Sequence, residues 1–384
     1  MNKIKPDSPS SVQGLGLVTL GLLGLGVVMV QSAAASVAQP GAWYARVDVR
    51  HTLFAIAAGI VLMTAWRLNF HWLSGPKSWP WISAVILAVT IMLGILVFVP
   101  GIGHSVGGFY RWIRIGPSKY QLGFQPSELI KLALVLFLSA WLSRPETNIR
   151  SFTRTFIPAM LLIGGCMALI ITQDFGTAML LAVAAGATLF LAGVPWYYLG
   201  GLVAAAAGGF WAFVVCDPYR WNRVEAMLNP WSSQNPAAYQ ARMSLIAIGR
   251  GGWEGRNLGM GIVKQGFLPE DTTDFIFSTF CEEWGFRGSV MLLGLVLMWI
   301  VLAWRLSLKA PTAFGRVLSG SLAFLIMLQA ILHIGVNLVV LPPKGIGFPF
   351  VSAGGTSLVI MAAATALIIS VTRGDENQLS ARTR

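Results

Sequence analysis

The sequence predicts an all-α polytopic membrane protein, on the basis of its composition, its mean hydropathy and the length of its apolar runs. Of its 384 residues, 55% are hydrophobic and only 11% are charged. The mean hydropathy of +0.69 lies well above that of soluble globular domains. Several apolar runs reach the roughly 20 residues that a helix needs to cross a bilayer. A β-barrel would instead need short segments of alternating hydrophobicity, so a helical bundle is expected.

Ten apolar runs are expected to be transmembrane helices, because a helix satisfies the polar backbone groups of a spanning segment internally. The first could instead be a signal peptide, since Ser32-Ala33-Ala34-Ala35 resembles a cleavage site. Its apolar run begins at Leu15 and exceeds a typical signal core, which favours a retained helix. The expected spans are 14–34, 51–66, 79–99, 126–143, 156–173, 177–193, 196–216, 283–305, 317–341 and 355–372.

The distribution of Lys and Arg predicts the orientation, because cytoplasmic loops carry an excess of these residues. With the N-terminus inside, the short inner segments carry 13 of them and the short outer loops carry six. Both termini are therefore expected in the cytoplasm. The six outer cations are Arg46, Arg50, Arg111, Arg114, Lys119 and Lys344.

One membrane domain is expected, formed by residues 1–373, with 374–384 as a short cytoplasmic tail. Residues 217–282 form a large extracytoplasmic loop between the seventh and eighth spans. Loops of this length are usually functional or disordered, and the aromatic and aliphatic content of this one argues against disorder. Helical stretches such as Tyr239 to Ile248 are expected within it.

The net charge of +12 does not point to nucleic acid, because no soluble basic domain is present to bind it. The inner cations suit anionic membrane lipids, and the outer cations suit an anionic substrate. The three cysteines, Cys166, Cys216 and Cys281, are scattered and give neither a disulfide framework nor metal-ligand spacing.

Acidic residues are concentrated in the large outer loop. Only 15 residues are Asp or Glu, and eight of them lie between Asp217 and Glu283. Asp274 precedes an apolar run at the expected membrane boundary, where partial burial can raise a carboxylate's pKa toward that of a general base. The alternative is that Thr273 or Asp274 caps the helix of the eighth span. The two roles are compatible.

Other polar groups near the outer face have structural alternatives. Glu128 and Lys131 lie three residues apart at the start of the fourth span, so they either line a polar cavity or form a purely structural pair. Asp174 precedes Gly-Thr and is expected to cap the next helix. Lys264 could hold a phosphate. His333 is expected to be hydrogen-bonded inside the bundle rather than to bind a metal.

Several blocks, in order along almost the whole chain, resemble the SEDS family (shape, elongation, division and sporulation), which includes FtsW and RodA. The blocks are Arg111-Trp112-Ile113 with Gly116, Gln125-Pro126-Ser127-Glu128 with Lys131, Asp174-Phe175-Gly176-Thr177-Ala178, Tyr239-Gln240 with Ser244-Leu245-Ile246-Ala247-Ile248-Gly249 and Gly251-Gly252, Leu268-Pro269-Glu270 with Thr273-Asp274-Phe275-Ile276-Phe277 and Glu282-Glu283, and Pro349-Phe350-Val351-Ser352 with Gly354-Gly355-Thr356-Ser357.

This resemblance implies ten transmembrane helices in the bacterial cytoplasmic (inner) membrane and polymerisation of lipid II into peptidoglycan strands, with loss of undecaprenyl diphosphate. It implies that Asp274 deprotonates the 4-hydroxyl of the acceptor sugar and that a class B penicillin-binding protein, a transpeptidase, is the partner. The opening segment is slightly closer to FtsW than to RodA. The residues implied to bind substrate are Arg111, Trp112, Gln125, Ser127, Glu128, Lys131, Lys264, Glu270, Thr273 and Ser352.

The chain departs from the family pattern at several positions. The first outer loop has an apparent insertion around 119–123. A proline is lost at Thr172-Gln173, and an Asn expected near His333 is replaced. Lys344 stands where Thr or Val is common, and Ala353 stands where Tyr is usual. The acidic centre is retained, so the expected chemistry is unaffected.

Two other functions fit the same composition. A flippase for the lipid-linked precursor predicts ionisable groups spread through the membrane, whereas the acids here concentrate outside. A non-catalytic scaffold that activates a partner synthase is the second. Diphosphate chemistry also allows a divalent cation, although the sequence shows no metal-ligand cluster and no metal site is expected.

Overall fold

Helices dominate the computed structural model, which describes residues 9–35, 42–64, 70–74, 80–106, 108–114, 123–231 and 235–372. Each of the expected spans coincides with a helix. Six of these helices are long and apolar enough to cross a membrane, so the helical multi-pass class is supported while the number of spans remains a prediction. The helices are α1 (Pro9–Ala34), α2 (Val47–Thr64), α3 (Trp81–Leu96), α4 (Pro126–Leu142), α5 (Ile157–Ile171), α6 (Phe175–Ala192), α7 (Trp196–Phe210), α10 (Ile276–Lys309), α11 (Ala313–Asn337) and α12 (Thr356–Thr372).

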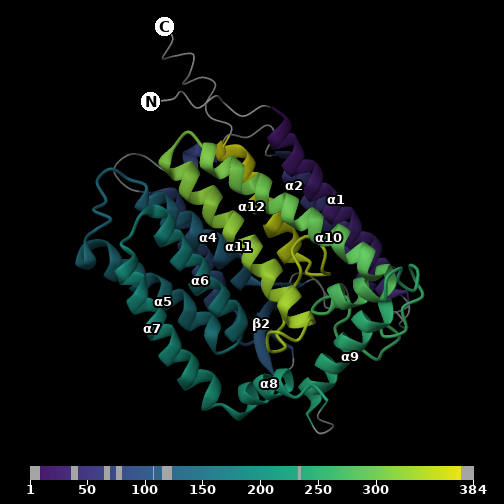
Figure 1. Cartoon of the computed structure of the whole chain (residues 1–384). Helices are drawn as coiled ribbons and strands as arrows, with labels where there is room; N and C mark the ends of the chain where they lie inside the picture. The colour runs from purple at the N-terminus through teal and green to yellow at the C-terminus, as the bar shows by residue number, and fades with distance from the viewer. Residues whose placement is uncertain are drawn as a thin grey trace.

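The large loop folds onto one end of the bundle. Its helices α8 (Pro218–Leu228) and α9 (Pro236–Gly251) confirm the prediction of helical stretches there. Figure 1 shows them at the end opposite to the start of α1 and the end of α12. The start of α1 and the end of α12 therefore lie on the same side of the bundle, as the predicted topology requires. That this side faces the cytoplasm remains a prediction.

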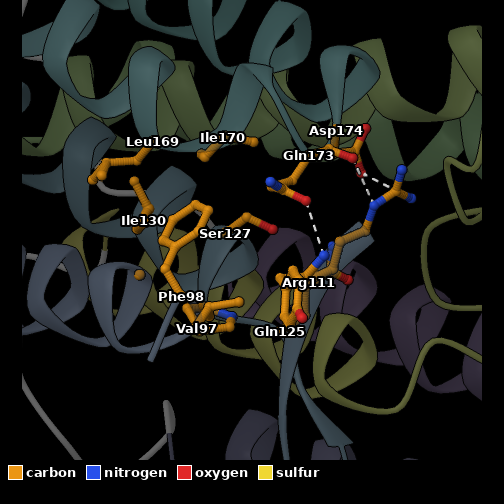
Figure 2. A pocket seen from close by; sticks show the side chains of 13 residues that line it. Val97, Phe98, Arg111, Gln125, Ser127, Ile130, Leu169, Ile170, Gln173 and Asp174 are labelled. Atoms are coloured by element: carbon orange, nitrogen blue, oxygen red, sulfur yellow. Dashed lines mark hydrogen bonds and ion pairs between the residues drawn. The ribbon is translucent and has the colours of Figure 1, made fainter. Parts of the chain in front are cut away.

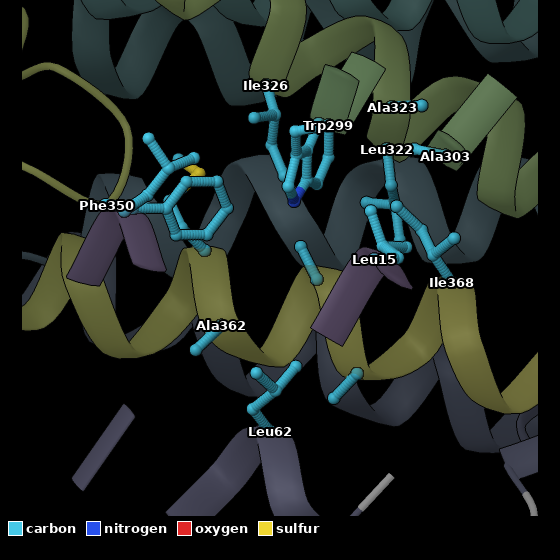
Figure 3. Close-up of a cluster of buried hydrophobic side chains, with 14 of the residues drawn as sticks. Leu15, Leu62, Trp299, Ala303, Leu322, Ala323, Ile326, Phe350, Ala362 and Ile368 are labelled. Atoms are coloured by element: carbon cyan, nitrogen blue, oxygen red, sulfur yellow. The ribbon is translucent and has the colours of Figure 1, made fainter. Parts of the chain in front are cut away.

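The bundle has two apolar cores. Side chains of α1, α2, α10, α11 and α12 gather around Trp299, as Figure 3 shows. The Trp299 indole N–H donates to the Thr19 hydroxyl at 2.9 Å, which satisfies its polar atom inside the core. A second core is formed by side chains of α3, α4, α5 and α6, and it includes Leu134 and Leu138 of α4. Since α4 also contributes Val135 and Leu136 to the first core, it is the central helix.

A small antiparallel sheet, which the all-α prediction missed, lies between α3 and α4. It comprises β1 (Gly103–Val106), β2 (Phe109–Arg114) and β3 (Gly123–Phe124) in the order β1-β2-β3. Aromatic and β-branched residues in β2 favour this pairing. Gly123 allows close packing, because a Cβ there would come within 2.9 Å of the Trp112 ring. The insertion around Lys119, like the 374–384 tail, lies outside the described residues.

Two helical segments joined at Gly285 make up α10, so the expected span from 283 corresponds to the segment after Gly285. A buried segment from Ile276 to Glu283 precedes it. Gly285 interrupts α10 with φ of 63° and ψ of −164°. A Cβ at Gly285 would come within 2.3 Å of the Gly255 nitrogen, so only glycine permits the loop to pack here.

Shorter helical segments flank the spans. The short segments are 3₁₀ turns at Trp43–Ala45 and Phe70–Ser74 and π-helical turns at Phe152–Phe156 and Trp211–Val215. In the expected span 196–216, helix α7 ends at Phe210 and the chain continues as the last of these π-helical turns.

Candidate active site

A polar cleft of about 240 Å³ lies at the end of the bundle that carries the large loop. It is bounded by β2, the turn before α6, the π-helical turn after α7, α8, the segment before α10 and the 342–345 turn. Four cations and three carboxylates line it, which suits an anionic substrate and acid–base chemistry. These side chains are Arg111, Arg220, Arg223, Lys344, Asp174, Asp217 and Asp274.

A tight turn before α10 positions Asp274 in the cleft. The Glu270 carbonyl accepts the backbone N–H groups of Thr273, Asp274 and Phe275 at 3.2, 3.0 and 3.1 Å. Glu270 itself adopts φ of 59°, an uncommon conformation for a residue with a side chain. Gly345 lies against the carboxylate, where a Cβ would come within 3.1 Å of Asp274 Oδ2.

Asn337 of α11 supplies the cap that the sequence assigned to Thr273 or Asp274. The N-cap position is Phe275, without a side-chain hydrogen bond. Instead, Asn337 Oδ1 accepts the Ser278 backbone N–H at 3.0 Å and the Ser278 hydroxyl at 2.7 Å. Its amide also donates to the Asp274 carbonyl at 3.0 Å. Asn337 is fully buried, so it holds both the start of α10 and the backbone of Asp274.

The surroundings of Asp274 favour a neutral carboxyl at mildly acidic pH. Burial, together with the negative charges of Glu270 and Asp174, raises the pKa of Asp274 from 3.8 to about 7. Arg223 and Arg111 act in the opposite direction. Burial is the largest cause, although Asp274 keeps part of its surface exposed where it lines the cleft. A carboxyl with a pKa near 7 can take up and release a proton at physiological pH.

Arg111 and Asp174 form an ion pair in the cleft. Arg111 Nε donates to the Gln173 carbonyl at 2.7 Å, and its Nη1 lies 3.9 Å from Asp174 Oδ2. Asp174 also caps α6, as predicted, by accepting the Thr177 backbone N–H at 3.0 Å. Gln173, at a position where the chain departs from the family, accepts the Tyr110 N–H through its side chain. The lost proline is thus replaced by contacts to β2.

A narrow pocket of about 30 Å³ adjoins the cleft and shares Arg111, Gln173 and Asp174 with it. Figure 2 shows Gln125, Ser127 and Arg111 around this pocket. Its apolar side chains are Val97 and Phe98, which follow α3, Ile130 of α4, and Leu169 and Ile170 of α5. Two of the expected substrate-binding residues, Gln125 and Ser127, therefore lie in this pocket rather than in the polar cleft.

Glu128 and Lys131 form the predicted ion pair, but it does not line either pocket. Lys131 Nζ lies 2.7 Å from Glu128 Oε1, and both side chains are almost fully buried. Glu128 Oε2 accepts the Ser357 hydroxyl at 3.1 Å, which links α4 to α12. This geometry favours the structural alternative. Trp112 likewise packs on Gly123 within the sheet.

Lys264 does not lie in the cleft, contrary to the expectation that it holds an anionic group there. Its Nζ lies 2.6 Å from Glu283 Oε1 and donates to the Ser32 carbonyl at 2.9 Å, with only 1% of the side chain exposed. Glu282 accepts the backbone N–H groups of Ile262 and Val263. These buried groups fasten the large loop to α1 and α10.

Three other expected site residues shape the Asp274 turn. Thr273 donates through its hydroxyl to Glu270 Oε2 at 2.9 Å. The Ser352 hydroxyl donates to the Thr273 carbonyl at 2.6 Å and accepts the Phe348 N–H at 2.6 Å. Ala353 donates its backbone N–H to the Thr272 carbonyl at 2.9 Å. Because that bond uses the backbone, the departure from Tyr at this position leaves the link in place.

His333 is bonded inside the bundle, as predicted, with Nδ1 at 2.7 Å from the Ile346 carbonyl and its ring stacked on Phe348. Among the described residues, no group of three or more His, Cys, Asp or Glu side chains is arranged to hold a metal ion.

Comparison with known proteins establishes the family. Residues 13–377 match the model of the FtsW, RodA and SpoVE family, described as cell cycle protein. The chain belongs to this family. It is 37% identical over 368 residues to the probable peptidoglycan glycosyltransferase FtsW of Allochromatium vinosum, covering 92% of this chain and 88% of that protein. It is 34% identical over 377 residues to the stage V sporulation protein E of Bacillus subtilis, covering 96% and 98%.

Solved structures of this family share the fold. RodA of Thermus thermophilus superposes with a TM-score of 0.66 at 25% identity, covering 94% of this chain and 96% of that one. A chain from a peptidoglycan synthase complex that coordinates polymerization and crosslinking gives 0.75 at 26% identity, covering 97% and 98%. This protein is accordingly a glycosyltransferase and an integral protein of the inner membrane.

Proposed function

We propose that this glycosyltransferase polymerises lipid II into peptidoglycan strands, with Asp274 as the general base. The observation that carries the proposal is the Asp274 carboxyl, which has a pKa near 7 and lines a cleft with four cations. Peptidoglycan as the product follows the names of the FtsW relatives. Asp274 takes the proton of the acceptor 4-hydroxyl, and that oxygen bonds to the anomeric carbon of the donor. The bond from this carbon to the undecaprenyl diphosphate breaks, with inversion.

The cations of the cleft are suited to the leaving diphosphate. Arginine forms bidentate, charge-assisted hydrogen bonds with phosphate oxygens, and Arg111 is held in place by Gln173 and Asp174. Diphosphate chemistry also allows a divalent cation, which proteins often hold through one or two carboxylates together with the substrate phosphates. The arginine and lysine side chains of the cleft are suited to neutralise the charge that develops on the diphosphate.

A crosslinking partner, a class B penicillin-binding protein, completes the proposal. A structural relative comes from a complex that joins polymerization to crosslinking. The large loop of this protein also exposes large apolar side chains, including Trp231, Trp253 and Met260. Exposed apolar groups of this size are common at protein interfaces. Growing glycan strands and membrane lipids are the other expected contacts.

Reconstitution with lipid II separates the possible functions. The purified protein, alone and with a transpeptidase partner, is expected to convert lipid II into glycan strands in liposomes. Movement of lipid II across the bilayer without strand formation would favour the flippase. Strand formation only by an added partner synthase, and unchanged when Asp274 is replaced, would favour the scaffold.

Asn337 provides a prediction about positioning. Replacing Asn337 by Leu removes the bond to the Asp274 carbonyl and is expected to lower kcat by about 10- to 100-fold, since small misplacements of a catalytic group are costly. The KM for lipid II is expected to stay within about two-fold, because Asn337 lies outside the cleft. Ser278→Ala is the matched control, because it keeps the Asn337–Asp274 bond. Equal losses in the two variants would show that Asn337 only stabilises the fold.

A further inference from the structure

Three buried polar side chains lie on one face of α11. They are Gln329, His333 and Asn337, and their spacing of four residues places them on successive turns of the helix. Asn337 donates through its amide both to the Asp274 carbonyl at 3.0 Å and to the His333 carbonyl at 2.9 Å. All three residues are at most 2% exposed, so the bonds that they form are shielded from water.

Gln329 and His333 bind the segment 344–348, which follows α11 along the chain and is neither helix nor strand. His333 Nδ1 lies 2.7 Å from the Ile346 carbonyl, and Gln329 Nε2 donates to the Gly347 carbonyl at 3.0 Å. Because a carbonyl oxygen only accepts, the ring proton of His333 lies on Nδ1. Its Nε2 is buried without a partner among the described residues, so the polar contact of the ring there is the bond to Ile346.

The same segment contacts the Asp274 turn at two points. At the first, Gly345 lies against the carboxylate, where a Cβ would come within 3.1 Å of Asp274 Oδ2. At the second, the Phe348 ring stacks on the His333 ring at 5.0 Å and meets Phe277, in the first turn of α10, edge-on at 6.2 Å. A shift of this segment would therefore move one wall of the carboxylate and open it to water.

We propose that His333 is a positioning residue for Asp274. Its bond to the Ile346 carbonyl fixes the segment 344–348, and this segment in turn limits the positions of the Asp274 carboxylate and its contact with water. The inference rests on the proposed function only in taking Asp274 as the group that reacts. An Asn is expected near His333 in the family pattern, and an Asn side-chain nitrogen, like His Nδ1, is bonded to Cγ. Either residue can donate this bond, whereas the stacked ring belongs to the histidine of this chain.

Two substitutions at His333 separate the hydrogen bond from the ring. His333→Phe keeps a ring against Phe348 and removes the donor, and it is expected to lower kcat about ten-fold while the KM for lipid II stays within about two-fold. His333→Asn keeps a donor on Cγ and is expected to stay within about three-fold of the wild type. A wild-type kcat in His333→Phe would overturn the proposal, and so would an equal loss in His333→Asn.

Coupling to Asp274 distinguishes positioning from a general effect on the fold. Because His333 acts through Asp274, His333→Phe is expected to lower the residual rate of Asp274→Asn by less than about two-fold. A ten-fold loss in that background as well would show that the substitution acts independently of Asp274 and would overturn the positioning role.

Thermal unfolding supplies a readout that needs no turnover. Burial is the largest cause of the raised pKa of Asp274, so a loosened segment 344–348 admits water and lowers that pKa. The rise in unfolding temperature that Asp274→Asn gives at pH 8 is therefore expected to be smaller in the His333→Phe background than in the wild-type background. Equal rises would overturn the proposal. Unequal rises in a protein that does not polymerise lipid II would refute the proposed function and retain the positioning role.

Discussion

Replacing Asp274 by Asn is expected to lower the rate of glycan formation by about 100- to 10,000-fold, the range for loss of a general base. Asn has nearly the same shape and keeps the backbone bonds to Glu270 and Asn337. It lacks a site that can accept the proton of the sugar hydroxyl. The measurement is strand formation from lipid II by matched amounts of wild-type and variant protein.

Asp271→Asn is the matched control for this variant. Asp271 lies in the same loop, and burial raises its pKa to about 7 as well, but it does not line the cleft. Its replacement is expected to change the rate by less than about three-fold, since it has no contact with the reacting atoms. A variant at Asp274 that polymerises at the wild-type rate would refute its role as the base.

Fold stability separates loss of chemistry from loss of structure. The folded-state pKa of Asp274 is raised above 3.8, so the unfolded state binds fewer protons between about pH 4 and 7. Folding stability therefore falls as the pH rises through this window. A neutral Asn removes that cost, so Asp274→Asn is expected to unfold at a higher temperature than the wild type at pH 8 while keeping its large loss of activity.

Replacing Lys264 by Met is expected to destabilise the fold by about 3–5 kcal/mol, because it leaves an uncompensated buried carboxylate at Glu283. The Glu283 side chain is fully buried, with Ser32 as its other hydrogen-bonding partner. The loss is expected as a lower thermal midpoint in detergent. Activity is expected to fall with it, since the pair fastens the loop that leads to Asp274.

Two further variants test whether the loss of stability in Lys264→Met comes from the unpaired buried charge. Lys264→Met/Glu283→Gln removes the second charge and is expected to recover most of the lost stability. Arg287→Gln breaks the exposed pair with Glu254 and is expected to cost less than about 1 kcal/mol. Equal midpoints for Lys264→Met and Arg287→Gln would contradict a stabilising buried pair.

Much of the helical architecture could be predicted because hydropathy alone reports which segments need to be shielded from water. Each expected span coincides with a helix. The helical segment before Gly285 was expected to be capped by Thr273 or Asp274, and no partners were predicted for its polar residues Ser278, Glu282 and Glu283. Their polar groups are satisfied by Asn337 and by the 262–264 backbone or side chains, which are tertiary contacts that a local pattern does not reveal.

The sequence also predicted part of the candidate site. Asp274 and Arg111 were expected in the site, and they meet in one cleft with Asp174, which was expected to cap the next helix. Arg220 and Arg223 were missed because the large loop was left out of the comparison of loop charges. Asn337 was missed although an Asn inside an apolar span is itself a signal. Lys264 was misassigned because a sequence does not show that an outward lysine turns inward to a buried glutamate.

The pH dependence of a single turnover tests the central claim most directly. Asp274 accepts a proton only when ionised, so the wild-type rate is expected to rise with pH through one ionisation near pH 7. The residual rate of Asp274→Asn is expected to lack this step. If the variant keeps the same rise with pH, another group accepts the proton and Asp274 is not the base.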